Sequence, residues 1–145
     1  MVRPVAEVVP NAILLHGPKG KFPPKMPRSV ELRCQTPARG VHFLGGISGW
    51  GFPLGEKGSV SLIVRLHYAD GMTEDHPLRN GVELADYMRP VDVPGSTLAF
   101  QLGGRQLRYL AVHPKRTEPI DRIELVKGPD GTSPVVMAVT VEVGE

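Results

Sequence analysis

Apolar and polar residues alternate along residues 60–68, and this pattern runs directly into a cluster of ionisable side chains. The apolar positions are Val60, Leu62, Val64, Leu66 and Tyr68. A period of two predicts a β-strand that packs on one face. The dipeptide Asp70-Gly71 follows, and both residues tolerate the positive φ of a two-residue hairpin turn. We therefore expect the chain to return through residues 73–76 as an antiparallel partner.

Shorter segments with strand character recur along the chain, at residues 12–15, 29–34, 41–44, 97–101, 105–112, 120–126 and 134–143. In residues 105–112, Leu107, Tyr109 and Ala111 share one face. Residues 134–143 are partly apolar on both faces, which is typical of a central strand. The residues that we expect to face one interior are Leu62, Val64, Leu66, Met137, Val139 and Val141.

The remaining segments read as arms, turns and loops. We expect an extended N-terminal arm at residues 1–11. Prolines at 23, 24 and 27 argue against regular structure in the loop that contains them. Residues 37–40 predict a turn, residues 45–58 predict a glycine-rich loop, and VELADYM at 82–88 is at most a local turn. Glycine and proline together exceed a fifth of the chain, with 17 and 15 residues, which disfavours helices.

These elements predict one all-β domain spanning residues 1–145. Alternating strands bury one face each, so a jelly-roll β-sandwich of about eight strands is the leading fold and a closed barrel is the alternative. No apolar run approaches the roughly 20 residues of a membrane span, and the N-terminus lacks the pattern of a signal peptide. Export is not excluded by this, because a leader can be missing from an excised domain.

The charge balance of 17 basic and 15 acidic residues, a net +2, does not favour a nucleic-acid partner. Basic residues gather in two segments, residues 19–28 and residues 115–116, which we interpret as solvated loops in preference to anion-binding patches. The single Cys34 lies in an alternating segment and is interpreted as a small core residue in preference to a nucleophile.

Four stretches resemble a known family: VHFLGGISGWGFP, VSLIVRLHYADGMTEDHPLRNGVELADYM, VDVPGSTLAF and PIDRIELVKGPDGTSPVVMAVTVEV. Together they resemble galactose-binding-like domains, and among these the C-terminal modules of planctomycete-type exported multidomain proteins, including cytochrome-like and dehydrogenase-like ones. The resemblance implies a jelly roll, an accessory role often in carbohydrate recognition, a parent multidomain protein of bacterial origin, and an extracellular or periplasmic location. It carries over no residue roles.

Candidate ligand-binding residues fall in two groups. Trp50 and Phe52 lie in the glycine-rich loop, where an exposed ring can stack on the apolar face of a sugar. The second group can hydrogen-bond or pack against a saccharide and comprises Arg65, His67, Asp70, Glu74, His76, Asn80 and Tyr87. We expect one site that combines Trp50 with the hairpin. The alternatives are a Trp50 that plugs the sandwich and a surface ion pair between Arg65 and Glu74.

Metal sites and catalysis are weaker interpretations. Oxygen ligands for a structural calcium ion are offered by Asp70, Glu74, Asp75 and Asp86, without the spacing of a calcium loop. Imidazoles for a transition metal are offered by His42, His67, His76 and His113, without paired spacing. Glu74 with Asp70 or Asp86 resembles a glycosidase pair, which any acidic chain offers by chance. The sequence contains neither a serine elbow nor a phosphate-binding loop.

The first functional hypothesis is therefore a non-catalytic carbohydrate-binding module without a cofactor, whose partners are a glycan and a parent protein. The second is a structural or protein-interaction domain of a larger exported protein. The third is a small hydrolase or a metal-dependent enzyme.

Overall fold

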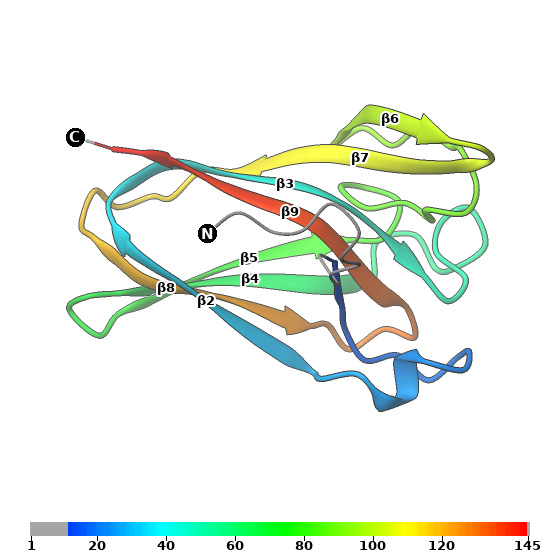
Figure 1. The fold of residues 1–145 in the computed structure, drawn as a ribbon, viewed down its shortest axis with the longest axis horizontal. Helices are drawn as coiled ribbons and strands as arrows, with labels where there is room; N and C mark the ends of the chain where they lie inside the picture. Colours follow the sequence, from blue (N-terminus) through cyan, green and yellow to red (C-terminus); the bar gives the residue numbers. More distant parts are fainter. Residues whose placement is uncertain (1–11, 145) are drawn as a thin grey trace, which may run out of the picture.

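The computed structural model describes residues 12–144, so the expected arm at residues 1–11 lies outside the described residues. Its strands are β1 (Ile13–Leu14), β2 (Ser29–Thr36), β3 (Ala38–Ser48), β4 (Val60–Tyr68), β5 (Thr73–Arg79), β6 (Thr97–Leu102), β7 (Arg105–Val112), β8 (Ile120–Lys127) and β9 (Ser133–Val143). They form two antiparallel sheets that face each other, in the orders β1-β9-β3-β7-β6 and β2-β8-β4-β5 (Figure 1). The predicted all-β sandwich is confirmed, with nine described strands where about eight were expected.

The strand order is that of a jelly roll. The first four strands alternate between the sheets, and the last strand, β9, lies between β1 and β3. In the second sheet β8 lies between β2 and β4, so each sheet pairs segments from distant parts of the chain. Strand β6 extends the first sheet beyond β7. Because most connections cross from one sheet to the other, loops that are remote in sequence meet at the two ends of the sandwich.

Helical structure in residues 12–144 is confined to one 3-10 turn, η1 (Pro23–Lys25), in the segment where we expected no regular structure. Proline is compatible with a first helical turn, because its φ is already helical and its missing N–H would be unbonded there anyway. Residues 82–88 form turns, as anticipated, and two isolated bridges, at Leu84 and Asp86. No helix in the described part of the chain has the length and apolar character needed to cross a bilayer.

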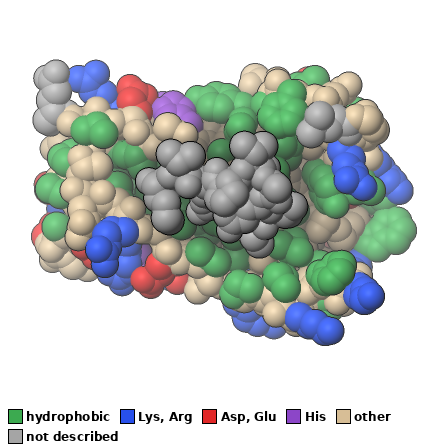
Figure 2. Space-filling view, in the orientation of Figure 1, with side chains coloured by type: hydrophobic (Ala, Val, Ile, Leu, Met, Phe, Trp, Pro, Cys, Tyr) green, Lys and Arg blue, Asp and Glu red, His purple; other side chains and the backbone are tan. Residues whose placement is uncertain are grey.

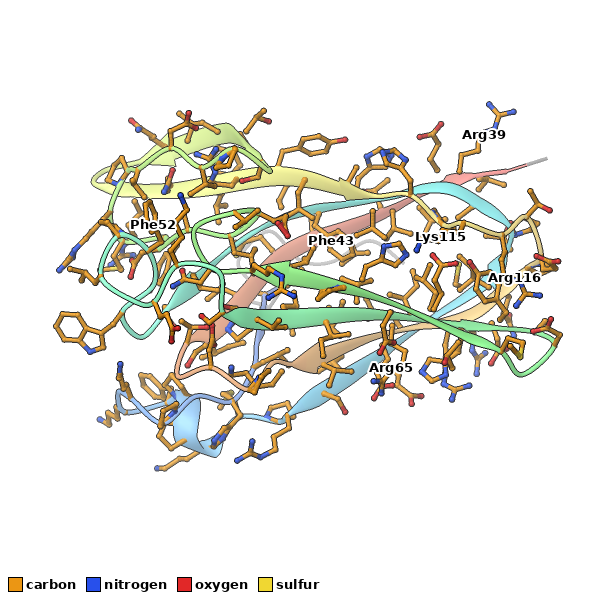
Figure 3. All side chains as sticks on the ribbon, turned by 180° about the vertical axis from the view of Figure 1, so that it is seen from behind. Arg39, Phe43, Phe52, Arg65, Lys115 and Arg116 are labelled. Carbon is orange, nitrogen blue, oxygen red and sulfur yellow. The ribbon has the colours of Figure 1, made fainter. Side chains whose placement is uncertain are left out.

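The hydrophobic core fills the space between the sheets. Leu62, Val64 and Leu66 of β4 are buried there as predicted. Phe43 of β3 points into this layer from the opposite sheet (Figure 3). Full burial of a side chain of this size contributes roughly 1.5–3 kcal/mol, so the β4 face that the alternation identified is a main source of stability.

Strand β9 departs from the predicted alternation at Met137. Its side chain is exposed, whereas Val136 is buried and Val139 packs against the core. The register explains the change: β3 pairs Leu44 with Ala138 but Gly45 with Val136, so Met137 is an extra residue. A bulge of one residue moves the following side chains to the opposite face. The prediction that Met137 faces the interior was therefore wrong.

Gly45 belongs to β3, although we expected the glycine-rich loop to begin there. A Cβ atom at Gly45 would lie 2.4 Å from the carbonyl oxygen of Val135, closer than any side chain allows. The glycine thus permits close approach of β3 to β9 at the bulge. The predicted turn at residues 37–40 is likewise mostly strand, because β3 begins at Ala38 and pairs with β9 from there.

Candidate functional site

The predicted ligand-binding residues lie at or toward opposite ends of the sandwich. Trp50, Phe52, Asn80 and Tyr87 lie at one end, and Arg65, His67, Asp70, Glu74 and His76 lie toward the other. The N–H of Asn80 donates to the carbonyl of Ser59, just before β4, and the N–H of Phe52 donates to the Asn80 side chain. Asp70 follows the other end of β4. Since nine strand residues span about 27 Å at 3.3 Å each, Phe52 and the hairpin turn are far apart, as the labels Phe52 and Arg116 in Figure 3 illustrate. The structure does not form the expected joint site of Trp50 and the hairpin.

The hairpin turn itself differs from the predicted two-residue form. The N–H of Gly71 donates to the carbonyl of Tyr68 at 3.0 Å, and Gly71 has a φ of 90°. Tyr68 in turn pairs with Met72, so three residues make the loop. Asp70 accepts the N–H of Met72 and forms an ion pair with Arg116 from the β7–β8 loop. The pKa of Asp70 lies below its usual value, mainly because its carboxylate accepts a hydrogen bond from the Arg116 side chain. Asp70 thus stabilises this end of the sandwich.

Arg65 and His67 lie on the outer face of the second sheet. Arg65 forms a bidentate ion pair with Asp75 at 2.8 and 3.1 Å, and His67 hydrogen-bonds Glu124 at 2.9 Å. The alternative ion pair between Arg65 and Glu74 is absent, because the register places Asp75, not Glu74, opposite Arg65. These side chains therefore mainly satisfy one another across neighbouring strands.

Glu74 and His76 point to the inner face, opposite Leu66 and Val64. The Glu74 carboxylate accepts hydrogen bonds from the Tyr68 hydroxyl at 2.8 Å, from His76, and from the backbone N–H of Lys115 at 3.1 Å. Burial opposes ionisation of Glu74, but these hydrogen bonds outweigh it and lower its pKa. Burial and Glu74 raise the pKa of Tyr68 to about 12. This inward cluster ties the β7–β8 loop to the edge strand β5.

A pH-dependent contribution to stability follows from Glu74. Because its pKa is lowered on folding, the contribution is full above the ordinary carboxyl value of 4.5 and is lost as the pH falls through the lower folded pKa. We expect Glu74→Gln to cost about 1–2 kcal/mol at pH 7, as a charged hydrogen-bond acceptor is removed. Melting curves of both proteins from pH 7 to pH 3 should converge at the acid end. A constant difference across this range would contradict the assignment.

The residues considered for metals are dispersed. His42 contacts Tyr109 and Glu142 on the outer face of the first sheet, and His113 approaches the backbone of Arg39. Asp86 lies at the Trp50 end, remote from Asp70. Within residues 12–144 no three His, Cys, Asp or Glu side chains form a group suited to a metal ion. A structural calcium ion stays a prediction.

Trp50 projects from the loop after β3, and 54% of it is exposed. Its φ is 69°, which is a left-handed conformation. For any residue other than glycine this conformation is unfavourable in free energy, and it is enriched at functional sites. The preceding Gly49 is also left-handed, with φ of 74°. At the following Gly51 a Cβ atom would lie 2.6 Å from Ile47 Cγ1, so only glycine fits. The loop backbone therefore holds the indole outward, and Trp50 is not a plug of the sandwich.

Two buried side chains brace this loop from the segments that follow β5. The Asn80 amide accepts the N–H of Phe52 at 2.7 Å and donates to the carbonyl of Glu56 at 2.9 Å. Asp86 accepts the N–H of Gly51 at 3.1 Å. Asn80 is fully buried and Phe52 is half-buried, so neither is presented to a ligand as Trp50 is. Asn80 and Phe52, which were both predicted to bind ligand, thus take part in the hydrogen bonds that position the loop.

A groove of about 620 Å³ lies beside Trp50. Strand β1, the loop around η1, the loop after β3 and residues 86–89 form its walls. Its large apolar side chains are Leu14, Phe22, Trp50, Leu54, Tyr87 and Met88. The half-buried Tyr87 is held by its N–H, which donates to the carbonyl of Ile47. Of the nine predicted ligand-binding residues, Trp50 and Tyr87 therefore line the groove together.

A second hollow, of about 580 Å³, adjoins the groove and shares Tyr87 and Val135 with it. Phe100, Leu107 and Met137 line it on the first sheet. It lacks a projecting ring on a braced loop, so the groove beside Trp50 is the better candidate site.

Gln106 of β7 positions the far wall of the groove, and Arg108 of the same strand positions the segment that follows this wall; sequence reasoning missed both. Gln106 donates to the backbone carbonyls of Asp86 and Arg89 at 3.1 and 3.0 Å. Arg108 is buried and donates to the backbone and side chain of Ser96 at 2.7 Å each. The sequence signal that could have identified them is alternation, because it places Gln106 and Arg108 on the same face of β7 as Leu110 and Val112.

Comparisons of the chain with protein-family models, with curated proteins and with solved structures gave no match. The groove is therefore interpreted from its own geometry.

Proposed function

We propose that the chain is a non-catalytic carbohydrate-binding module that serves as an accessory domain of a larger exported protein. The observation that carries the proposal is the exposed Trp50, held in a left-handed conformation at the wall of a groove at one end of a rigid sandwich. The resemblance to galactose-binding-like domains supports the accessory role.

The chemistry of the groove suits a saccharide. The indole of Trp50 and the rings of Phe22 and Tyr87 offer flat apolar surfaces for the C–H face of a sugar. Lys19 and Arg89 add hydrogen-bond donors at the same groove. A volume of about 620 Å³ falls within the usual range of small-ligand sites, about 300–1,000 Å³. Because sugar hydroxyls exchange water for protein at small net gain, we expect dissociation constants on the order of micromolar to millimolar.

Replacing Trp50 with alanine is expected to weaken retention on a polysaccharide gel by about thirtyfold or more, since a central aromatic contact is worth about 2 kcal/mol. The melting temperature should change little, because the loop is braced by backbone contacts of Gly51 and Phe52. Met72→Ala is the matched control: it removes an apolar side chain of similar exposure at the hairpin end. Affinity electrophoresis and thermal melts measure both effects.

A Trp50→Gly variant separates stacking from strain, because glycine adopts a φ of 69° freely. It should bind as weakly as Trp50→Ala while melting at the same or a higher temperature. Unfolding of Trp50→Ala and Trp50→Gly alike would show that the ring is structural and would remove the basis of the proposal.

A protein-interaction domain is the second candidate, favoured by the exposed apolar side chains of Phe22, Leu54 and Met88 around the same groove. This candidate replaces the first if the intact protein binds no member of a broad glycan array.

A further inference from the structure

We propose that the groove beside Trp50 selects an acidic saccharide, whose carboxylate or sulfate groups pair with Lys19 and Arg89 while a sugar ring stacks on the indole. The inference rests on the proposed function and assigns its ligand class. It follows from the distribution of charge around the groove, which the near-neutral net charge of the whole chain conceals.

The exposed charges of the groove are positive. Lys19 and Arg89 are exposed and line it from opposite segments, the loop before η1 and the loop after residue 86. Within residues 12–144, neither forms an ion pair with a carboxylate, in contrast to Arg65 and Arg116. Figure 2 shows Lys and Arg side chains beside hydrophobic ones at the right-hand end, where η1 and the loop after β3 lie. These cations are available to a ligand.

Asp86 is the acidic residue among the described lining of the groove, and its carboxylate is buried and already hydrogen-bonded. It is 4% exposed, and its two oxygens accept the N–H groups of Gly51 and Met88 at 3.1 and 2.8 Å. Glu56 lines an adjoining hollow of about 170 Å³ that also contains Lys19, and it is not part of the groove wall. A ligand in the groove therefore meets two exposed cations and no exposed carboxylate of the described wall.

The aromatic and basic groups occur together on the same loop. The Nζ atom of Lys21 lies 5.8 Å from the ring centre of Phe22, and Phe22 itself lines the groove. Lys25 ends η1 close by in sequence. Uronates and sulfated sugars carry an anionic group on the edge of a ring with an apolar face, so they match rings flanked by ammonium and guanidinium groups. A neutral sugar would leave these cations without a partner.

An anionic membrane would also meet exposed rings and lysines, but the described surface is a groove between four segments, which encloses a chain of sugar rings better than a flat interface. The two sources of anionic groups, carboxylate and sulfate, are separated by the choice of polysaccharide.

Binding of the intact chain to polygalacturonate, to a sulfated galactan and to a neutral galactan is measured by affinity electrophoresis and calorimetry. We expect an acidic polymer to bind at least about tenfold more tightly than the neutral one at low salt, and this preference to fade as salt rises. Lys19→Gln combined with Arg89→Gln should abolish the preference but keep the Trp50-dependent binding of the neutral polymer. Lys115→Gln, an exposed lysine at the opposite end, is the matched control and should bind as the wild type does.

Each other outcome decides against the inference in a distinguishable way. Equal binding of acidic and neutral polymers by wild type and the double variant would overturn the ligand class and leave carbohydrate binding intact. Absence of binding to every saccharide would overturn both proposals. Binding to vesicles of phosphatidylserine and phosphatidylcholine, without binding to any polysaccharide, would show that the groove end is a membrane-contacting surface instead.

Discussion

Replacing Asp130 with alanine is expected to destabilise the sandwich by about 3–5 kcal/mol, because it leaves the Lys127 ammonium buried without its counter-ion. The Lys127 and Asp130 side chains are 3% and 9% exposed and lie 3.1 Å apart. The ammonium otherwise contacts backbone carbonyls of Gly128 and Asp130, at 2.6 and 2.7 Å. Burial lowers the pKa of Lys127, so its charge is tolerated only with such partners. This loss is a large part of the free energy of unfolding of a domain, which is usually about 5–15 kcal/mol.

Asp130 also joins three segments at the groove end. Its carboxylate accepts hydrogen bonds from Ser59 at 2.8 Å, from Ser61 of β4, and from the Thr132 hydroxyl at 2.6 Å. Burial opposes its ionisation, but these hydrogen bonds, led by that of Ser61, lower its pKa. Its contribution is therefore complete above the usual carboxyl pKa of 3.8 and is lost as the pH falls through the lower folded value.

Urea unfolding followed by circular dichroism measures the effect. Adding Lys127→Met to Asp130→Ala should recover much of the loss, because the unpaired buried charge is then removed. Asp121→Ala is the control, since its ion pair with Arg122 is half-exposed and is expected to contribute less than about 1 kcal/mol. An Asp130→Ala protein as stable as the control would show that the buried pair is not needed.

Replacing Arg108 with methionine is expected to cost about 3–5 kcal/mol, as several buried acceptors each lose a hydrogen bond worth about 1–3 kcal/mol when left unsatisfied. The side chain is 2% exposed. Besides Ser96 it donates to the carbonyls of Val91 and Val93, at 3.2 and 3.3 Å, and to the Asp92 carboxylate at 2.8 Å. Arg108 thereby holds the segment between the groove wall and β6 against β7.

This substitution should also weaken the proposed saccharide binding, because Arg108 donates to the Gln106 side chain at 3.3 Å and Gln106 in turn holds the backbone of Asp86 and Arg89. Arg108→Lys should behave like Arg108→Met, since an ammonium cannot reproduce the planar fork of donors. Arg105→Ala, an exposed position of the same strand, should melt like the wild type. If Arg108→Met melts within a few degrees of the wild type, the arginine does not anchor the segment.

The outcome at β4 and β9 shows what alternation predicts. A period of two identifies a strand and its two faces from local residues alone, so β4 and its buried Leu62, Val64 and Leu66 were predicted correctly. The bulge at Met137 was not predictable, because it depends on how β9 pairs with β3. For β7, alternation separated the faces but did not show that the face with Arg108 is the buried one.

The sequence by itself determined the all-β sandwich and the hairpin after β4, because local backbone preferences and side-chain periodicity specify these features. Whether Trp50 projects from its loop or plugs the sandwich was left open. Only the tertiary structure decided the site. The jelly-roll order brings residues near 20, 50 and 88 together around one groove, and it separates Trp50 from the hairpin by the length of β4. The physical reason is that strand pairing between distant segments, not any local pattern, selects which loops meet at each end.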